Sequence, residues 1–414
     1  MSDKDNKSSG NTIHSCQENS EGGILIINSY PPKRLRRVVF EAAPYKKANY
    51  ERGDAVFASV VVAPLVVGVW RSSLGIMELH AKMFPYAQNF VLGIIIHCCF
   101  SIAKTRLFSR SVDAWGQGKA GRWLRERVLS RFYTYIFIMS NVMHWRGGWG
   151  LMDTMVAAIL PNDQDPHRPV LIATYLIVCI VLILVLRSAR NLLGPPYLVV
   201  TDGKQPTYIF TTRFQKSSSE TALYILDCVF SVTVVGSLVL FVWRGLWALI
   251  DIYLYPDDFV KSCWTSLIVG YSMVVVMFSL QVPMRWLLAR LQGAPRLLIA
   301  DVYHLVSFAS TINVWRGVWG LLDIYFLPDS PHLSNWSCHI VSLMLLMLLN
   351  CSNSILVRGV YIDAEEPAGE CIIFPCHYLR LFIHKKRPKR HKALDLMKKM
   401  EEASMPLQTP EEKL

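Results

Sequence analysis

Eight apolar runs constrain this chain more than any other feature of its sequence. They lie at roughly 55–78, 87–104, 132–158, 169–187, 222–250, 264–284, 300–325 and 336–357. A helix that crosses a bilayer needs about 17–25 mostly apolar residues, and several of the runs reach that length. A membrane β-barrel would instead show shorter segments of alternating polarity. The sequence therefore predicts an all-α polytopic membrane protein with about eight transmembrane helices.

Composition and charge agree with this class. The chain has 414 residues, of which 52% are hydrophobic and 18% charged, and its mean hydropathy is +0.30. Residues 1–22 lack the apolar core of a cleavable signal peptide, so we expect the first span to direct insertion. The net charge of +12 lies in the tails and between the apolar runs. That distribution is typical of membrane orientation and does not indicate nucleic-acid binding.

A Trp-Arg-Gly motif recurs towards the end of every second run. It reads "HWRGGWGLMD" at 144–153, "VWRGLWALID" at 242–251 and "VWRGVWGLLD" at 314–323, with a weaker copy, "VWRSSLGIME", at 69–78. A short loop and another apolar run follow each copy. Internal repeats of this kind are a common plan of membrane folds. We therefore expect four two-helix units, each carrying WRGxWxxxD or its remnant.

A second recurrence sets the register of these units. Asp54 and Asp227 each lie sixteen residues before the first tryptophan of a copy, and Asp301 lies fourteen before. A carboxylate suits the unpaired N–H groups at a helix start, so these residues are predicted to mark the beginnings of first helices. The stretch "GPPYLVVTD" at 194–202 is echoed by "GAPRLLIAD" at 293–301.

Basic residues predict the orientation of the chain. Lysine and arginine gather in the linkers 104–131 and 187–220 and in both tails, whereas the loops after the motif are acidic. The positive-inside rule then places both termini in the cytosol and the motif loops outside. The expected organisation is a basic N-terminal tail at 1–50, a transmembrane domain at 51–360 and a basic C-terminal tail at 361–414.

The motif has two interpretations. In the first, tryptophan belongs to the aromatic belt at the membrane interface and arginine reaches the lipid headgroups. In the second, the charges are buried. Arg146 and Asp153 are seven residues apart, or about 10 Å along a helix, which is too far for an intrahelical pair. Each buried arginine would then pair with an acid of a neighbouring unit.

The second interpretation has two functional versions. The charges could form a clasp between repeats, or they could form an outward-facing site for an anion or a lipid headgroup. Each arginine brings its own neutralising acid, which favours the clasp, and glycine beside arginine lets helices approach closely. The candidate residues are Arg71, Glu78, Arg146, Asp153, Arg244, Asp251, Arg316 and Asp323.

Other candidate sites are weaker. Cys263 and Cys338 are expected in outer loops, where they form either a disulfide or two unpaired thiols. Asn335 begins an Asn-Trp-Ser glycosylation sequon. Cys371 and Cys376 resemble juxtamembrane palmitoylation sites. We expect no metal site, no cofactor and no catalytic constellation.

The end of the chain mixes apolar and basic residues. Residues 379–400 read "LRLFIHKKRPKRHKALDLMKKM". This segment either lies on the anionic lipids of the inner leaflet or is a solvated tail.

Eight spans, cytosolic termini and the repeated WRGxWxxxD motif together resemble the Fuseless family, eight-pass membrane proteins of insect presynaptic terminals. The resemblance covers roughly residues 55–360. It implies a plasma-membrane protein, not an enzyme, that acts in synaptic transmission at neuromuscular junctions. Such proteins promote the localisation of presynaptic voltage-gated calcium channels, so a channel or an active-zone scaffold protein is the implied partner. The alternative is a channel or secondary transporter that uses the repeated arginines.

Overall fold

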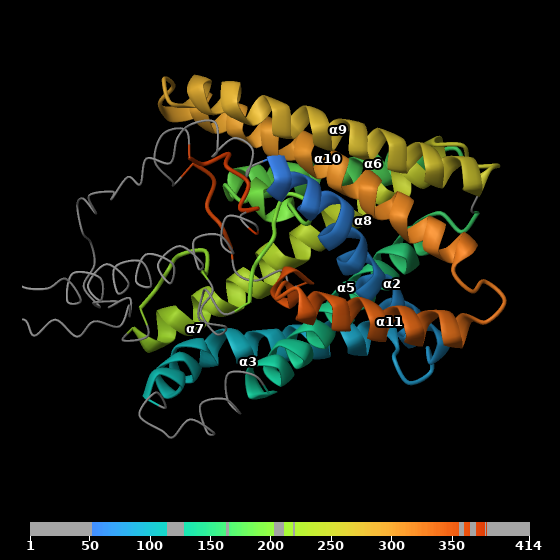
Figure 1. Ribbon diagram of the computed structural model, residues 1–414, viewed down its shortest axis with the longest axis horizontal. Coiled ribbons are helices and arrows are strands. Elements are labelled where there is room, and N and C mark those ends of the chain that lie inside the picture. The colour runs from blue at the N-terminus through green and yellow to red at the C-terminus, as the bar shows by residue number, and fades with distance from the viewer. Residues whose placement is uncertain are drawn as a thin grey trace, which may run out of the picture. The chain divides into compact units, whose positions relative to one another are not determined.

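The computed structural model describes residues 52–113, 128–162, 165–202, 211–217, 220–355, 360–364, 370–376 and 378. The expected N-terminal tail and the segment 379–400 lie outside this range. All regular secondary structure in the described part is helical, as Figure 1 shows. The long apolar runs have produced helices because each can satisfy its backbone groups internally without water.

Each predicted apolar run coincides with a helical stretch. The principal helices are α2 (Ala63–Leu79), α3 (Tyr86–Asp113), α5 (Ser130–Ile159), α6 (Arg168–Val185), α7 (Thr221–Phe230), α8 (Ser237–Tyr253), α9 (Phe259–Leu288), α10 (Gly293–Tyr325) and α11 (Pro331–Leu348). Two short π-helical segments adjoin these helices, η1 (Ala58–Val62) before α2 and η5 (Ser231–Gly236) between α7 and α8. The 3-10 helices η4 (Ala189–Leu192) and η6 (Ser352–Ile355) follow α6 and α11.

Six of these helical stretches are long and apolar enough to cross a membrane. They are Arg52–Leu79, Tyr86–Leu107, Arg168–Val185, Thr221–Tyr253, Phe259–Leu288 and Gly293–Tyr325. The chain is therefore a multi-pass helical membrane protein by length and composition. Helices α5 and α11 fall short of that measure because they carry polar residues such as Asn141, His144 and His339, all of which are buried.

The helices that carry the motif are central. Helix α2 contacts α5 and α10, and α8 contacts the same two helices. About half of the apolar window in α2, α8 and α10 is buried, against 17% in α3, α6 and α9. The outer helices thus turn most of their apolar surface outwards, as lipid-facing helices do.

Each outer helix packs on the motif helix of the next unit. Helix α3 packs on α5, α6 on α8 and α9 on α10. The last outer helix, α11, packs back on α2, and Figure 1 shows α11 and α2 side by side despite their separation in sequence. The short loop after each motif therefore leads from the motif helix of one unit to an outer helix that packs on the next unit. Because the last outer helix packs on the first motif helix, the four units form a closed circle.

The packed core extends past the predicted end of the transmembrane domain. Ile372, Phe374 and Tyr378 are buried, and Tyr378 stacks on Phe57 with ring centroids 4.2 Å apart. The boundary predicted after residue 360 therefore does not mark the end of the packing. Phe374, beyond that boundary, packs on Tyr303 of α10 and Phe278 of α9, and these apolar side chains are removed from water there.

Two of the three aspartates expected at helix starts lie inside helices. Helix α10 begins at Gly293, so Asp301 belongs to its third turn. Asp227 lies within α7 and accepts hydrogen bonds from the main-chain N–H groups of Phe214 and Lys216, at 2.9 and 3.0 Å. The Asp227 carboxylate therefore binds main-chain N–H groups of the segment before α7 and does not cap the start of α7. Asp54 does lie in the first turn of its helical stretch.

Candidate functional site: a closed ring of arginines and tryptophans

Each motif arginine forms an ion pair with the motif acid of the preceding unit. The distances are 2.6 Å for Arg71 Nε–Asp323 Oδ1, 3.1 Å for Arg146 Nε–Glu78 Oε1, 2.8 Å for Arg244 Nη2–Asp153 Oδ1 and 2.7 Å for Arg316 Nε–Asp251 Oδ1. These pairs join α2 to α10, α5 to α2, α8 to α5 and α10 to α8. The structure thus brings all eight candidate residues together in one closed ring.

The two ends of each pair differ in exposure. The arginine side chains are 2–20% exposed, whereas the acids are 43–52% exposed. A buried guanidinium is costly unless it is paired and its N–H groups are satisfied. The ring therefore places its positive charges in the helix interfaces and its negative charges at the edge.

Arg316 is the most fully satisfied of the four guanidiniums. Besides Asp251, it donates to the hydroxyls of Ser266 and Ser262 at 2.8 and 2.7 Å, and to the main-chain oxygen of Ser262 at 3.3 Å. Both serines belong to α9, the outer helix packed on α10. One side chain thus joins three helices, since Asp251 belongs to α8.

Arg71 and Arg146 repeat this arrangement with different partners. Arg71 donates to the hydroxyl of Ser334 on α11 at 3.2 Å. Arg146 donates to the main-chain oxygen of Phe84, and its guanidinium lies 4.7 Å from the ring centroid of Tyr86. In each case the extra contact comes from the outer helix or from the loop leading into it.

The first tryptophans of the four copies form a second ring on the inner side. Their ring centroids are 5.1 Å apart for Trp70–Trp145, 5.5 Å for Trp145–Trp243, 5.0 Å for Trp243–Trp315 and 6.1 Å for Trp70–Trp315. These are distances at which aromatic rings attract one another. The four indoles are 3–7% exposed. The interpretation of these tryptophans as an interfacial belt is therefore wrong, because they face one another and not the lipid.

Three indole N–H groups are fixed by main-chain oxygens. Trp70 donates to Ile355 at 3.1 Å, Trp243 to Leu192 at 3.1 Å and Trp315 to Pro195 at 2.8 Å. The acceptors belong to the segments that follow α6 and α11. These bonds satisfy buried donors and tie both segments to the centre of the helix bundle.

A small cavity lies beside the tryptophan ring. It has a volume of about 40 Å³ and is lined by the four indoles, by Arg190–Pro195 and by Leu198, Val239, Ser354, Ile355 and Tyr361. A water molecule needs about 10–15 Å³ by this measure. The cavity has room for water, and none of the four motif arginines lines it.

Glycine in the motif permits the outer helix to approach. A Cβ atom on Gly317 would lie 2.7 Å from the main-chain nitrogen of Leu267, and one on Gly245 would lie 3.0 Å from the Tyr175 ring. In the weaker first copy, Ser72 takes the place of this glycine and bonds to its own helix at Gly68. The motif thus combines a charge pair with a close helix contact.

Of the two alternatives for Cys263 and Cys338, the structure has two unpaired thiols, and both are buried. Cys263 lies in α9, where its Sγ atom packs against Gly320 of α10. Cys338 lies in α11 and contacts the main-chain oxygen of Gly68 on α2 at 3.5 Å. Each thiol belongs to a different helix pair, which separates the two.

The predicted modification sites are also buried. Asn335 is 7% exposed, and its amide fills the space above Gly75, so it cannot present itself as a glycosylation acceptor. Cys371 and Cys376 are 2% and 5% exposed. Burial raises the pKa of the Cys376 thiol, and a protonated buried thiol is a poor nucleophile for palmitoylation.

Two polar groups were missed by the sequence reasoning. Asp202 forms an ion pair with Arg131. It also accepts hydrogen bonds from the N–H groups of Ser352 and Asn353 at 3.0 and 2.8 Å. The echo between 194–202 and 293–301 was the available signal for this aspartate. Asp301, His304 and Asp363 form the other group, for which the signal was an Asp-x-x-His spacing on one helix.

The fold and the ring define a class: multi-pass helical membrane proteins whose central helices are joined by buried arginine–carboxylate pairs. The Fuseless family model matches residues 49–356, and the chain belongs to the Fuseless family. No curated protein and no solved structure gave a match to the chain.

Proposed function

We propose that this chain is an eight-pass plasma-membrane protein of the presynaptic terminal that supports synaptic transmission through the localisation of voltage-gated calcium channels. Membership of the Fuseless family supports this role. In the proposal both termini are cytosolic, where a basic C-terminal tail can meet anionic lipids. The direct partner is a presynaptic calcium channel or an active-zone scaffold protein.

Eight crossings require α5 and α11 to span the membrane too. At 1.5 Å per residue, the 30 residues of α5 and the 18 residues of α11 extend about 45 Å and 27 Å. The hydrocarbon core is about 30 Å thick. Their polar residues Asn141, His144 and His339 are buried against other helices, which removes the main cost of placing these helices in lipid.

The arginine ring acts in this proposal as an architectural clasp. One observation carries it: each guanidinium is neutralised by a carboxylate from the preceding unit. An anion site built from this ring would need uncompensated positive charge of the motif arginines facing an accessible cavity, whereas none of them lines the cavity beside the tryptophans. The proposal includes no catalytic step.

Loss of the protein tests the role in channel placement. In nerve terminals that lack it, we expect calcium-channel clusters at active zones to be reduced, and wild-type protein to restore them. A variant with Arg146, Arg244 and Arg316 all replaced by glutamine is expected to restore clusters only in proportion to its folded abundance. Normal clusters in terminals that lack the protein would contradict the proposal.

Transport through the ring is the competing function, and the four guanidiniums with half-exposed acids are the observation in its favour. Ion flux in proteoliposomes separates the two. We expect equal chloride and phosphate flux for wild type and for the triple glutamine variant, each confirmed as folded by size-exclusion chromatography. Flux that falls when the arginines are removed would make this a transport protein.

A further inference from the structure

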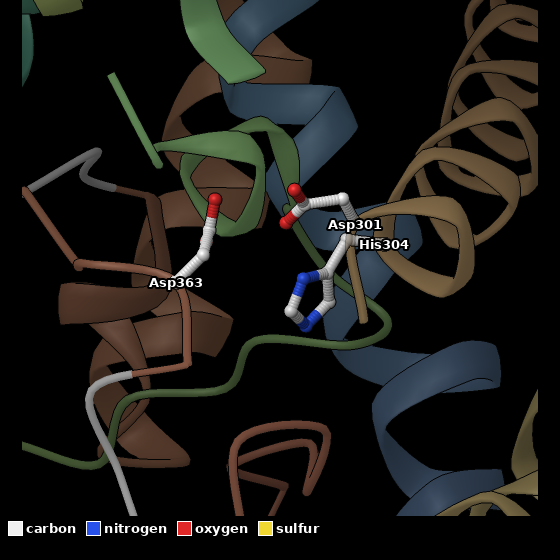
Figure 2. Close-up of side chains that lie close together, drawn as sticks. All are labelled: Asp301, His304 and Asp363. Carbon is white, nitrogen blue, oxygen red and sulfur yellow. The ribbon is translucent and has the colours of Figure 1, made fainter. Parts of the chain in front are cut away.

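Three buried side chains capable of binding a metal converge near the start of α10. Asp301 and His304 are three residues apart on that helix and therefore share a face. Asp363 reaches them from the segment 360–364. Ligand atoms of all three lie within 4.8 Å of one another. Figure 2 shows the Asp301 carboxylate and the His304 ring projecting from α10 towards Asp363.

Two polar atoms of this group are not satisfied by the protein. Asp301 is 5% exposed and His304 is 1% exposed. Asp301 Oδ1 and His304 Nδ1 have no hydrogen-bond partner in the described part of the chain. Leaving a buried polar atom unpaired costs about 1–3 kcal/mol, and more for a charged one. Two such atoms in one group indicate that something else binds there.

The histidine is oriented as a metal ligand would be. Its ring hydrogen-bonds the main chain of Cys371, and because Nδ1 has no partner, Nε2 makes this bond. A metal-bound histidine usually donates its other ring N–H to an oxygen such as a main-chain carbonyl. His304 makes such a bond and keeps a lone pair on its other ring nitrogen, Nδ1. In Figure 2 that nitrogen is the one nearer to the carboxylates.

The Asp363 carboxylate is held in place by backbone donors. Its Oδ2 accepts from the N–H of Ala189 at 2.5 Å and its Oδ1 from the N–H of Arg190 at 2.9 Å. A carboxylate oxygen has two lone pairs, so each oxygen can still bind a cation. The group is thus preorganised by the start of η4.

Two arginines lie beside the group and limit which ions it can bind. Arg187 donates to the main-chain oxygen of Asp363 at 2.6 Å, and the Arg190 guanidinium lies 5.2 Å from the ring centroid of Tyr361. Their charge weakens the attraction for any cation. An ion that gains strongly from imidazole coordination is therefore favoured over Mg²⁺ or Ca²⁺, which prefer oxygen ligands alone.

We propose that Asp301, His304 and Asp363 bind a divalent transition-metal ion, with Zn²⁺ as the preferred occupant. Imidazole nitrogen and carboxylate oxygen are both ligands that Zn²⁺ takes in proteins, and a second carboxylate oxygen can complete four-coordination. The ion satisfies both orphaned atoms and offsets the repulsion between the two carboxylates. Its role is structural: it fastens the segment 360–364 to α10. A proton shared by the carboxylates is the competing arrangement, and it leaves His304 Nδ1 unpaired.

Metal content and cobalt spectroscopy of the full chain in detergent test this site. We expect about one zinc ion per wild-type chain, and a rise in melting temperature when Zn²⁺, but not Mg²⁺, is added to chelator-treated protein. Co²⁺ in its place should give the visible bands of nitrogen and oxygen ligation without a thiolate charge-transfer band, which excludes binding by the cysteines.

Near-isosteric variants locate the ion. Asp301→Asn and His304→Gln are each expected to lose most of the zinc and the thermal response, whereas the matched control His339→Gln, another buried histidine, should keep both. A folded wild-type chain that carries no zinc and does not respond to added Zn²⁺ or Co²⁺ overturns the proposal. So does zinc that persists in folded Asp301→Asn and His304→Gln proteins.

Discussion

The Nε atom of Arg316 on α10 lies 2.7 Å from the Oδ1 atom of Asp251 on α8. The acid of its own motif copy, Asp323, pairs instead with Arg71 on α2. The charges of one copy thus contact two different helices. This connection between units is what makes the stability of one motif depend on its neighbours.

The arginine with the most hydrogen bonds should contribute most to stability. Arg316→Ala removes the ion pair and three further hydrogen bonds from a side chain that is 4% exposed, and we expect a loss on the order of 2–4 kcal/mol. Arg244 is 20% exposed, so Arg244→Ala should cost on the order of 1 kcal/mol. Thermal unfolding in detergent measures both. Equal losses would contradict this ranking.

Adding a methyl group at Gly317 should separate two helices. The new Cβ would lie 2.7 Å from the backbone nitrogen of Leu267, so α9 must move away from α10, and we expect Gly317→Ala to destabilise the protein by about 1–3 kcal/mol. Gly236 is the matched control, because a Cβ there meets no atom closer than 3.7 Å. Its alanine variant should unfold at or near the wild-type temperature.

The tryptophan ring should be a principal element of the core. Trp243 contacts Trp145, Trp315 and Phe308 and donates a hydrogen bond to the Leu192 main chain, so we expect Trp243→Ala to cost about 3–5 kcal/mol. Near-UV circular dichroism should lose much of its indole signal, because adjacent rings in a fixed arrangement dominate it. Trp286 is 60% exposed, and Trp286→Ala should change the spectrum far less.

Cys263 and Cys338 should both be recovered as thiols. Alkylation after denaturation without a reductant, followed by peptide mass spectrometry, should find both residues modified, because each packs in a separate helix pair. In the native state both should resist alkylation by a maleimide, because each is buried. A Cys263–Cys338 disulfide-linked peptide would show that the helices rearrange.

The sequence predicted the positions of the helices, but it did not predict which acid pairs with which arginine. Hydrophobic run length is a local property, and it placed a helix at each of the eight runs. The seven-residue spacing of arginine and acid also excluded an intrahelical pair. The spacing did not show which neighbour supplies the acid, because that depends on how the short loops direct each outer helix to the next unit.

The burial of single side chains was the least predictable feature. Cys263, Cys338 and Asn335 lie within the first three turns of α9 and α11, and sequence alone placed them near the outer surface. Their burial follows from glycines on other helices, at positions 320, 68 and 75, and such a contact leaves no mark in the local sequence.

The sequence by itself determined that this chain is a helical membrane protein with a recurring arginine, tryptophan and acid, because apolar run length and motif spacing are read directly along the chain. Only the tertiary structure decided that the arginines pair in a closed ring, that four tryptophans meet on its inner side and that Asp301, His304 and Asp363 converge. The physical reason is that such contacts depend on the crossing of helices far apart in sequence, which the burial of whole helix faces sets collectively.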